Sequence, residues 1–429
     1  MEKVLILTYY WPPSGGPGVQ RWLKFVKYLP GLGFQPVIVT VDPQQANYPV
    51  ADASLLDEVP AQLQVHSTPT REPYAIYKKL TGKKQLPYSG FVNEKEEGGM
   101  SKISRFIRGN LFVPDARVGW NAFAVKKASE LIRDHNIKYL ITTSPPHSTQ
   151  LAGIKLKESF PHLHWIADLR DPWTDIFYYR KMLHTSYVRR KDKKLEEKVL
   201  RSADDVVTVS DYIREIFQKK LEPYLQDKIK VVTNGYDEED FAEEVSSAEN
   251  SFFTISYVGT LAEAYNLKGF VAAVKNLQEL LKGKLQLRFT GHICEKWKEE
   301  LQQLPGDSVS FHSHVPHREA ISEMRKADML LLVIPEMPQS EGIITGKLFE
   351  YLACEIPVLG IGPPEGNAAE ILRQSRCGEM FAWDMTTEIQ TYIEENALRK
   401  REWHPRKDVI QSFSRYQQAV KLVNLMSEK

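Results

Sequence analysis

The sequence predicts an α/β protein of two domains, each a parallel β-sheet covered by helices. Short apolar runs alternate with longer segments of helical periodicity along the whole chain, which is typical of parallel sheets with helical connections. This pattern restarts after the acidic, serine-containing stretch EEVSSAENS at residues 243–251. A chain of 429 residues is also too long for one hydrophobic core and suits two.

Each half contains a series of expected strands. In the first half they are VLILTYY from Val4, PVIVTV from Pro36, YLITTS from Tyr139, HWIADL from His164, DVVTVS from Asp205 and IKVVTNG from Ile229. In the second half they are FFTISYVGT, LQLRFTG, VSFHSHV, MLLLVIP and IPVLGIG. We expect domains over residues 1–245 and 246–400, with a long insertion at 72–112. We also expect one C-terminal helix over 401–429, packed across both halves, because its apolar residues have helical spacing: Phe413, Tyr416, Val420 and Leu422.

Bulk properties exclude several classes of protein. The net charge is only +1 and no nucleic-acid motif occurs, so we expect no nucleic-acid partner. The amino terminus lacks a secretory signal, and no apolar run reaches the length of a membrane span of about 18 residues. Three cysteines without metal-ligand spacing indicate a reducing compartment. The expected location is therefore cytoplasmic.

A glycine-rich turn, PPSGGPG, follows the first strand and precedes the helical segment VQRWLKFVKYL. Glycines such as Gly16 and Gly18 let the backbone approach a ligand closely, and helix-start amides attract anions. The alternative is a tight turn that the fold requires. The turn is neither a Walker phosphate loop nor a dinucleotide fingerprint, because it lacks the residues and the spacing of both.

Two polar clusters follow the strands at Tyr139 and His164, and they read TTSPPHS and IADLRDPWTD. Open α/β sheets bind ligands at the carboxyl ends of their strands. We therefore expect His147, Arg170 and Asp171 to point toward a crevice. The alternative is a structural ion-pair network of Asp168 with Arg170 and Asp171.

The segment EGIITGKLFEYLACEIPVLGIGPPEGNAAEIL from Glu341 gives the clearest indication of a ligand site. Thr345 and Gly346 precede a helix that begins near Lys347, an arrangement that presents amides, a hydroxyl and an ammonium to a phosphate. Glu350 lies on the same helical face and could accept both hydroxyls of a ribose. The alternative is a capped amphipathic helix with a surface Lys–Glu pair.

The stretch TGKLFEYLACEIPVLGIGP resembles the nucleotide-sugar motif of the retaining glycosyltransferases of family 4. The segments YYWPPSGGPGVQRW, SPPHS, DLRDPW, VSDYIRE, NGYD and YVGTL occur in the matching order, so the resemblance covers nearly the whole chain. It implies the α/β fold named GT-B, with two Rossmann-like domains, a donor cleft between them and a C-terminal crossover helix. The implied activity moves a sugar from a nucleotide-diphosphate sugar to a saccharide or lipid-linked acceptor, in surface polysaccharide or glycolipid synthesis.

The resemblance also implies donor-binding positions. It puts Gly16 and Gly18 near the phosphates and the acceptor, Gly259 and Thr260 near the diphosphate, Gly291 and Val315 beside the base, Thr345, Gly346, Lys347 and Leu348 at phosphate or ribose, and Glu350 at the ribose.

This chain departs from the family pattern at two positions. Thr260 stands where the family commonly has an arginine, and Lys268 is the only lysine nearby. Neutralisation of the diphosphate then falls to Lys268, Lys347 or both. Glu341 is one residue too far from Glu350 for the family's usual pair of glutamates, so its sugar contact is open.

We expect no metal and no cofactor besides the donor, because no Asp-X-Asp occurs in the sequence. The expected mechanism is front-face transfer with retention, in which a donor phosphate oxygen helps to deprotonate the acceptor. The candidate catalytic residues are Lys347 and Glu350 at the donor, with His147 or Asp171 orienting the acceptor or the sugar.

Three stretches mix basic residues with aromatic and aliphatic ones: residues 78–84, 102–112 and 177–194. Such stretches suit an anionic membrane surface at the inner face of the membrane. A solvated basic face is the alternative. Two other functions also stay open, namely a non-catalytic nucleotide-sugar-binding subunit of a polysaccharide assembly machine and a nucleotide-sugar epimerase of the same fold.

Overall fold

The computed structural model describes residues 1–72, 105–106, 109–242, 252–305, 308–400 and 402–427. The chain divides into unit 1, Met1–Thr233 with Ala419–Lys429, and unit 2, Asn234–Gln418. The expected boundary at 245/246 differs from this division, because residues 234–242 cluster with unit 2. There the amide of Tyr236 donates to the carbonyl of Phe413 at 3.3 Å, and its carbonyl accepts from the amide of Arg415 at 2.8 Å.

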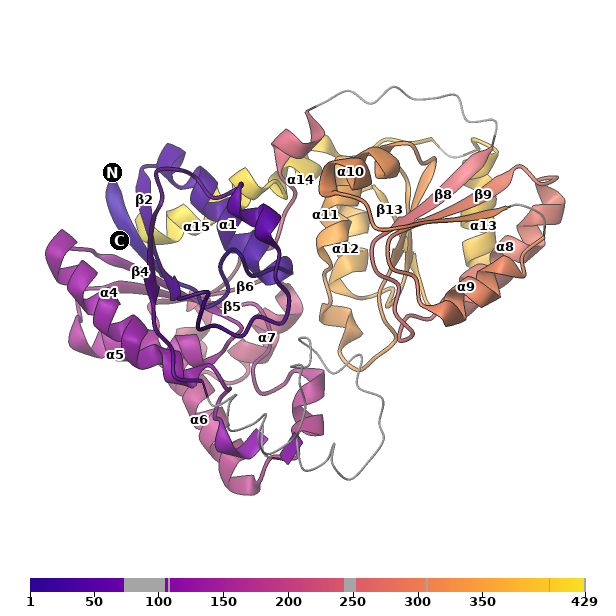
Figure 1. Cartoon of the computed structure of the whole chain (residues 1–429). Helices are drawn as coiled ribbons and strands as arrows, with labels where there is room; N and C mark the ends of the chain where they lie inside the picture. The colour runs from indigo at the N-terminus through magenta and orange to yellow at the C-terminus, as the bar shows by residue number, and fades with distance from the viewer. Residues whose placement is uncertain (73–104, 107–108, 243–251, 306–307, 401, 428–429) are drawn as a thin grey trace. The chain divides into compact units, whose positions relative to one another are not determined.

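Unit 1 contains a seven-stranded parallel sheet in the order β3-β2-β1-β4-β5-β6-β7 (Figure 1). Its strands are β1 (Glu2–Leu7), β2 (Phe34–Val41), β3 (Gln64–Thr68), β4 (Tyr139–Ser144), β5 (His164–Leu169), β6 (Asp205–Thr208) and β7 (Ile229–Val231). Of these strands, β3 is the one that was not expected. This strand lies at the edge of the sheet and exposes most of its side chains, so it lacks the apolar run of a central strand.

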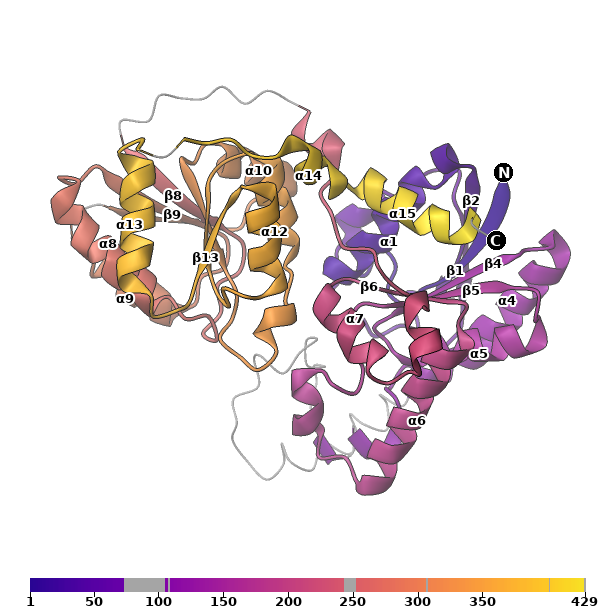
Figure 2. The same cartoon turned by 180° about the vertical axis from the view of Figure 1, so that it is seen from behind.

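Alternate residues of β1 enter two different cores, because successive side chains of a strand point to opposite faces of the sheet. Leu5 and Leu7 pack with one layer of helices, whereas Val4 and Ile6 pack with another. The first layer comprises α4 (Asn121–His135), α5 (Ser148–Ser159), α6 (Ser186–Ser202) and α7 (Asp211–Gln218). The second comprises α1 (Pro17–Tyr28) and α15 (Arg415–Ser427), which lie on the same face of the sheet (Figure 2).

The C-terminal segment forms two helices where one was expected. Helix α14 (Lys407–Ser412) ends just before Phe413, and α15 begins at Arg415. The first packs into a core of unit 2 through Ile410, whereas Leu422 and Met426 of the second are buried in unit 1. The chain therefore returns to the first unit at its end.

Unit 2 contains a six-stranded parallel sheet in the order β10-β9-β8-β11-β12-β13. Its strands are β8 (Phe253–Val258), β9 (Leu285–Thr290), β10 (Val309–His312), β11 (Met329–Val333), β12 (Val358–Ile361) and β13 (Gly378–Phe381). Helices α8 (Lys268–Leu280), α9 (Glu295–Gln302) and α13 (Thr386–Ala397) share a core with one face of β8, and α10 (His317–Arg325), α11 (Gly346–Ala353), α12 (Asn367–Ser375) and α14 with the other. Sequence analysis missed β13, a short edge strand.

In both sheets the order of the strands reverses at the first strand of the unit. β1 lies between β2 and β4, and β8 lies between β9 and β11. Such a switch point leaves room for a ligand beyond the carboxyl ends of the strands. The glycine-rich turn after β1 and Gly259 after β8 lie at these two places, so the fold puts a candidate binding turn in each unit.

Candidate active site

Lys347 lies in the first turn of α11, where its side chain reaches the end of strand β8. Its Nζ donates a hydrogen bond to the hydroxyl of Tyr257 at 2.6 Å and lies 4.3 Å from the centroid of that ring. Gly259 makes room for it. A Cβ at Gly259 would lie 2.5 Å from Cε of Lys347, and the backbone there has a φ of +126°. The turn therefore needs a glycine for both its conformation and this close approach.

Burial lowers the pKa of Lys347 to about 8, and the nearby carboxylate of Glu350 opposes this shift. Desolvation disfavours the charged form of a lysine, whereas a neighbouring negative charge favours it. At pH 7 the ammonium form still predominates, so the residue offers a positive charge at the start of the helix.

Thr345 is the N-cap residue of α11, and its side chain does not cap the helix. Its Oγ1 is buried and has no hydrogen-bond partner within the described part of the chain. Buried hydroxyls are normally satisfied, and the first amides of a helix have no partner inside the helix. Gly346 leaves open space beside these groups. A phosphate group would satisfy the hydroxyl and the amides together.

The ends of β8 and β9 are joined by close backbone contacts. Gly291, with a φ of +120°, lies so near Gly259 that a Cβ on it would be 2.4 Å from the carbonyl oxygen of Gly259. That oxygen accepts a hydrogen bond from the amide of His292 at 3.2 Å. Gly259 and Gly291 therefore allow the ends of the two strands to lie close together. The expected contact of Gly291 with a nucleotide base remains a prediction.

Glu350 lies one turn after Lys347, and about a fifth of its side chain (22%) is exposed. Burial raises its pKa, while His317 and Arg415 are the main charges that lower it. Nε2 of His317 lies 3.9 Å from Oε1 of Glu350 and 3.3 Å from Oδ2 of Asp240. A partly exposed carboxylate in this position can accept hydrogen bonds from hydroxyl groups. It does not form the simple surface Lys–Glu pair of the alternative interpretation, because Lys347 turns to Tyr257.

The structure spreads the other predicted donor residues over unit 2. The side chain of Leu348 is fully buried in the core, and its amide donates to the carbonyl of Thr345 at 3.1 Å. The expected position of Leu348 at the phosphate or ribose stays a prediction, and with its side chain buried it can involve only the backbone of this residue. The remaining four lie at strand and helix ends: Thr260 (exposed), Lys268 (exposed, at the start of α8), Val315 (half-buried, before α10) and Glu341 (exposed).

In unit 1, Asp168 is a structural residue. It is completely buried at the end of β5 and accepts hydrogen bonds from Arg21 Nη2 at 3.1 Å, Trp22 Nε1 at 2.8 Å and Thr143 Oγ1 at 2.8 Å. Every one of these partners lies inside the unit, but the ion pair joins Asp168 to Arg21 and not to Arg170 or Asp171, so the members of the expected structural network differ.

Arg170 fills the space that Gly18 leaves open. A Cβ at Gly18 would lie 2.6 Å from Nη1 of Arg170, and Nε of the same guanidinium donates to the carbonyl of Ser144 at 2.7 Å. Gly16 precedes α1 with a φ of +100°. The glycine-rich turn is therefore shaped in part by an arginine from the second polar cluster.

His147 precedes α5, and its ring stacks on Trp173 with centroids 4.9 Å apart and an interplanar angle of 9°. Burial, with help from the positive charge of Arg170, lowers the pKa of His147 to about 3. The imidazole is consequently neutral at pH 7, and its buried Nδ1 has no hydrogen-bond partner among the described residues. Burial also raises the pKa of Asp171, which follows Arg170 in the sequence, and the positive charge of Arg170 opposes that shift. These two groups can orient a hydroxyl, but His147 does not supply a positive charge.

Two further residues were not identified from the sequence. Tyr257 has the sequence pattern of an ordinary core aromatic of a strand, and only the structure shows its contact with Lys347. Asp115 accepts hydrogen bonds from the amide and the hydroxyl of Ser148 at 2.7 and 2.8 Å, and so fixes the turn that holds His147. No pattern in the sequence pointed to it.

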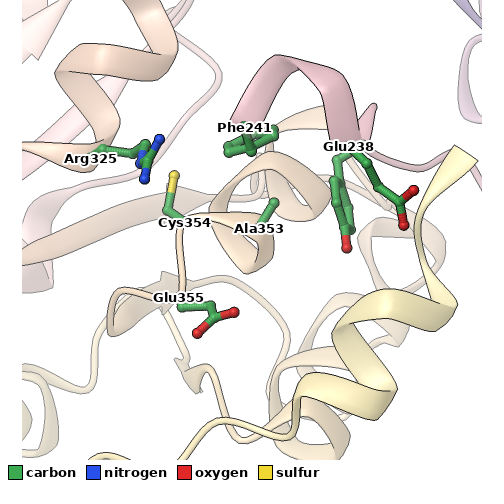
Figure 3. Close-up of a pocket in the computed structure, with 7 residues that line it drawn as sticks. Glu238, Phe241, Arg325, Ala353, Cys354 and Glu355 are labelled. Atoms are coloured by element: carbon green, nitrogen blue, oxygen red, sulfur yellow. The ribbon is translucent and has the colours of Figure 1, made fainter. Parts of the chain in front are cut away.

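A cavity of about 420 Å³ lies at the opposite end of α11 from Lys347. It is lined by Tyr236 and by six residues that Figure 3 labels: Glu238, Phe241, Arg325, Ala353, Cys354 and Glu355. It contains none of the predicted site residues. Burial raises the pKa of the Cys354 thiol, which makes it a poor nucleophile at neutral pH.

Within the described ranges, no three His, Cys, Asp or Glu side chains converge in a way that could hold a metal ion. None of the helices in that part of the chain is long and apolar enough to cross a membrane. The absence of a metal from the reaction stays a prediction.

Comparison with known proteins agrees with this geometry. Residues 88–240 match the family model described as Glycosyltransferase Family 4, and residues 253–395 match the model described as Glycosyl transferases group 1. The chain belongs to the family 4-like glycosyltransferases. This glycosyltransferase is 24% identical over 208 residues to the putative teichuronic acid biosynthesis glycosyltransferase TuaH of Bacillus subtilis (strain 168). The match covers 46% of this chain and 50% of TuaH, so it spans about half the length of that relative.

Solved glycosyltransferase structures share the fold of this one. Sucrose-phosphate synthase (tll1590) from Thermosynechococcus elongatus has a TM-score of 0.63 at 11% identity, over 100% of this chain and 99% of that chain. WaaG, a glycosyltransferase involved in lipopolysaccharide biosynthesis, has a TM-score of 0.55 at 14% identity, over 98% and 99%. At such low identities the likeness concerns the fold alone, and it confirms the predicted α/β GT-B class.

Proposed function

We propose that this glycosyltransferase moves a sugar from a nucleotide-diphosphate sugar to a saccharide or lipid-linked acceptor, in the synthesis of a surface polysaccharide or glycolipid. One observation carries the proposal. The start of α11 carries the ammonium of Lys347 and the buried hydroxyl of Thr345, which has no hydrogen-bond partner within the described part of the chain. A diphosphate supplies the negative charge and the acceptor oxygens that these groups lack. The polysaccharide context rests on the names of TuaH and WaaG.

The residues of unit 2 would act on the donor. When the bond between the sugar and the phosphate breaks, negative charge accumulates on the departing nucleoside diphosphate. The ammonium of Lys347 and the helix-start amides stabilise that charge, since fixed donors aimed at a developing charge lower the barrier. Glu350 accepts hydrogen bonds from the ribose hydroxyls and so holds the nucleotide in register.

Transfer proceeds with retention and without a metal ion in this proposal. The acceptor hydroxyl attacks from the face that the diphosphate leaves, and its proton passes to a phosphate oxygen of the donor. No protein nucleophile is then required. The neutral imidazole of His147 and the carboxyl of Asp171 orient the acceptor or the sugar by hydrogen bonds, which suits the low pKa of His147. Product analysis by NMR tests this, because an inverted anomeric linkage would contradict retention.

Alanine substitution of the two donor residues tests the activity itself. Lys347→Ala and Glu350→Ala should each abolish donor binding or turnover, measured as release of nucleoside diphosphate from a panel of nucleotide sugars. Lys268→Ala decides whether the second lysine shares the neutralisation. Lys275→Ala is the control, because it removes an exposed charge of α8 in the same unit. Near-normal turnover in both the Lys347 and the Glu350 variants would refute the proposal.

We also propose that a basic surface of unit 1 meets an anionic membrane. Within the expected stretch 177–194, several basic and apolar side chains around the start of α6 are exposed: Lys181, Leu183, Tyr187, Arg190, Lys191 and Lys194. Basic groups interleaved with aromatic ones suit a negatively charged lipid surface. Residues 78–84, and most of 102–108, lie outside the described residues. Sedimentation with anionic vesicles, and its absence with neutral ones, is expected; absence of binding to both would remove this part of the proposal.

A further inference from the structure

We propose that Tyr257 is a positioning residue for Lys347, and that its hydroxyl and ring hold the ammonium over the end of β8 for the diphosphate of the donor. This inference rests on the proposed function and deepens it. Tyr257 does not itself touch the donor in this scheme. It acts through the lysine.

The hydrogen bonds around the Tyr257 hydroxyl have only one consistent direction. The hydroxyl lies 2.6 Å from the carbonyl oxygen of Thr260 and 2.6 Å from Nζ of Lys347. A carbonyl can only accept, so the single phenol proton goes to Thr260. The oxygen then has only lone pairs to offer to Lys347. Lys347 is then the donor, and an ammonium donates more strongly than a neutral amine, so the arrangement favours the charged lysine.

The ring supplies a second attraction and a fixed support. Nζ of Lys347 lies 4.3 Å from its centroid, within the range in which a cation is attracted to an aromatic face. Tyr257 is only 1% exposed, and its ring packs against Phe289 in the core with centroids 6.0 Å apart. A lysine side chain is otherwise a flexible stem. The packing of Tyr257 in the core therefore fixes the position of the Lys347 ammonium.

The partner of the Tyr257 hydroxyl at position 260 is a backbone carbonyl, so this hydrogen bond does not depend on the side chain of Thr260. That side chain is exposed and uncharged, and Lys347 is the cation that contacts Tyr257.

Several titratable groups act on the pKa values of Lys347 and Tyr257. Glu350, on the same helix, is the charge that acts on Lys347, and it is itself faced by His317, Asp240 and Arg415. Tyr265 and Tyr351 are the neighbours that act on Tyr257, and burial keeps the pKa of Tyr257 well above its ordinary value. The phenol thus stays neutral, and Lys347 is the group that changes charge near pH 8.

The test compares Tyr257→Phe with the wild-type protein and with Tyr392→Phe. The first variant loses the hydroxyl and keeps the ring. In the control, Tyr392 of α13 loses a buried hydroxyl that donates to the carbonyl of Val358 on β12, in the same unit. Calorimetric titrations with UDP, GDP, ADP and dTDP run from about pH 7 to about pH 9.5, around the pKa of Lys347. Tyr257→Phe should raise the Kd of the bound diphosphate roughly tenfold or more, the weight of a hydrogen bond to a charged group.

A second readout separates positioning from a general loss of structure. Loss of a hydrogen bond to the charged form lowers a lysine pKa, so the alkaline fall in diphosphate affinity should move to lower pH in Tyr257→Phe. It should stay in place in Tyr392→Phe. If Tyr257→Phe is unstable, NMR of the 15N-labelled lysine in the wild-type protein gives the same information. A Lys347 signal with the high pKa and fast proton exchange of a free surface lysine would overturn the inference.

The outcomes distinguish the two proposals. If the wild-type protein binds a diphosphate and Lys347→Ala does not, but Tyr257→Phe matches the wild type in both affinity and pH profile, the positioning role is wrong and the donor site stands. If the wild-type protein binds none of the diphosphates, the proposed function fails and this inference fails with it.

Discussion

Substitution of Gly259 by alanine tests whether the position of the Lys347 side chain requires a residue without a Cβ at the end of β8. The added Cβ would lie 2.5 Å from Cε, 2.9 Å from Nζ and 3.5 Å from Cδ of Lys347. Since the far end of a lysine moves easily, we expect the side chain to swing away and leave Tyr257. The backbone, at a φ of +126°, stays in a region that alanine disfavours by about 1–3 kcal/mol.

Gly283→Ala is the matched control for this prediction. This residue also has a positive φ, +74°, but a Cβ there would meet nothing within 4 Å. Both variants should therefore lower the Tm of unit 2, by about 2–4 °C for each kcal/mol in a domain of this size. Only Gly259→Ala should also weaken the diphosphate. A lost hydrogen bond to a charged group is worth about 1.5–3 kcal/mol, or roughly a 10- to 150-fold rise in Kd.

The assay is calorimetric titration of the two variants with the diphosphate that the wild-type protein binds, alongside thermal unfolding without ligand. Equal diphosphate affinity in Gly259→Ala and Gly283→Ala would refute the reasoning, because it would mean that the position of Lys347 does not matter for the ligand.

Three more predictions follow from the described contacts. Thr345→Val should raise the Kd of the diphosphate by roughly 2- to 10-fold in calorimetric titration with no loss of thermal stability, because its buried hydroxyl has no hydrogen-bond partner among the described residues. Thr345→Ser should restore affinity. Asp168→Asn should lower the free energy of unfolding by about 3–5 kcal/mol in urea titrations, since it removes the carboxylate that pairs with the buried guanidinium of Arg21, and a loss below about 1 kcal/mol would contradict this. The folded-state pKa of His147, about 3, lies below the value of about 6.5 in an unfolded chain, so the unfolded state binds the extra proton first and stability falls as the pH drops below about 6.5. Urea titrations at about pH 7 and pH 5 should show a smaller loss in His147→Gln than in the wild type, and equal losses would count against the buried neutral imidazole.

The sequence predicted the central strands well, because buried parallel strands are continuous apolar runs. The stretch from Tyr139 to Ser144 and that from His164 to Leu169 form strands over the expected residues. The two missed strands, β3 and β13, are both at sheet edges, where one side of the strand lacks a neighbour and fewer apolar residues are needed. The division of the C-terminal segment was also missed, since helical spacing across Phe413 and Tyr416 does not reveal a break between them.

The candidate site was predictable wherever a local motif carries the chemistry. Thr345, Lys347 and Glu350 lie within one helix, and their spacing alone put a hydroxyl, an ammonium and a carboxylate together. Tyr257 was missed because its contact with Lys347 joins residues 90 positions apart. The ring of Tyr257 packs in the core, and its hydroxyl contacts Lys347. The apolar pattern of the strand indicates only the packing in the core. Leu348 lies within the same motif, but its side chain is fully buried, so its expected contact with phosphate or ribose stays a prediction that concerns its backbone alone.

The central claim is that unit 2 binds a nucleoside diphosphate through Lys347 and the start of α11, without a metal. The most direct measurement is a thermal-shift screen of nucleoside diphosphates and nucleotide sugars, run with magnesium and with a chelator. A ligand that binds only the folded protein raises its apparent stability with the logarithm of ligand concentration. We predict that one diphosphate and its sugars stabilise the wild-type protein equally in both conditions, and that Lys347→Ala loses this response. No response to any of them, or a response only with magnesium, would contradict the account.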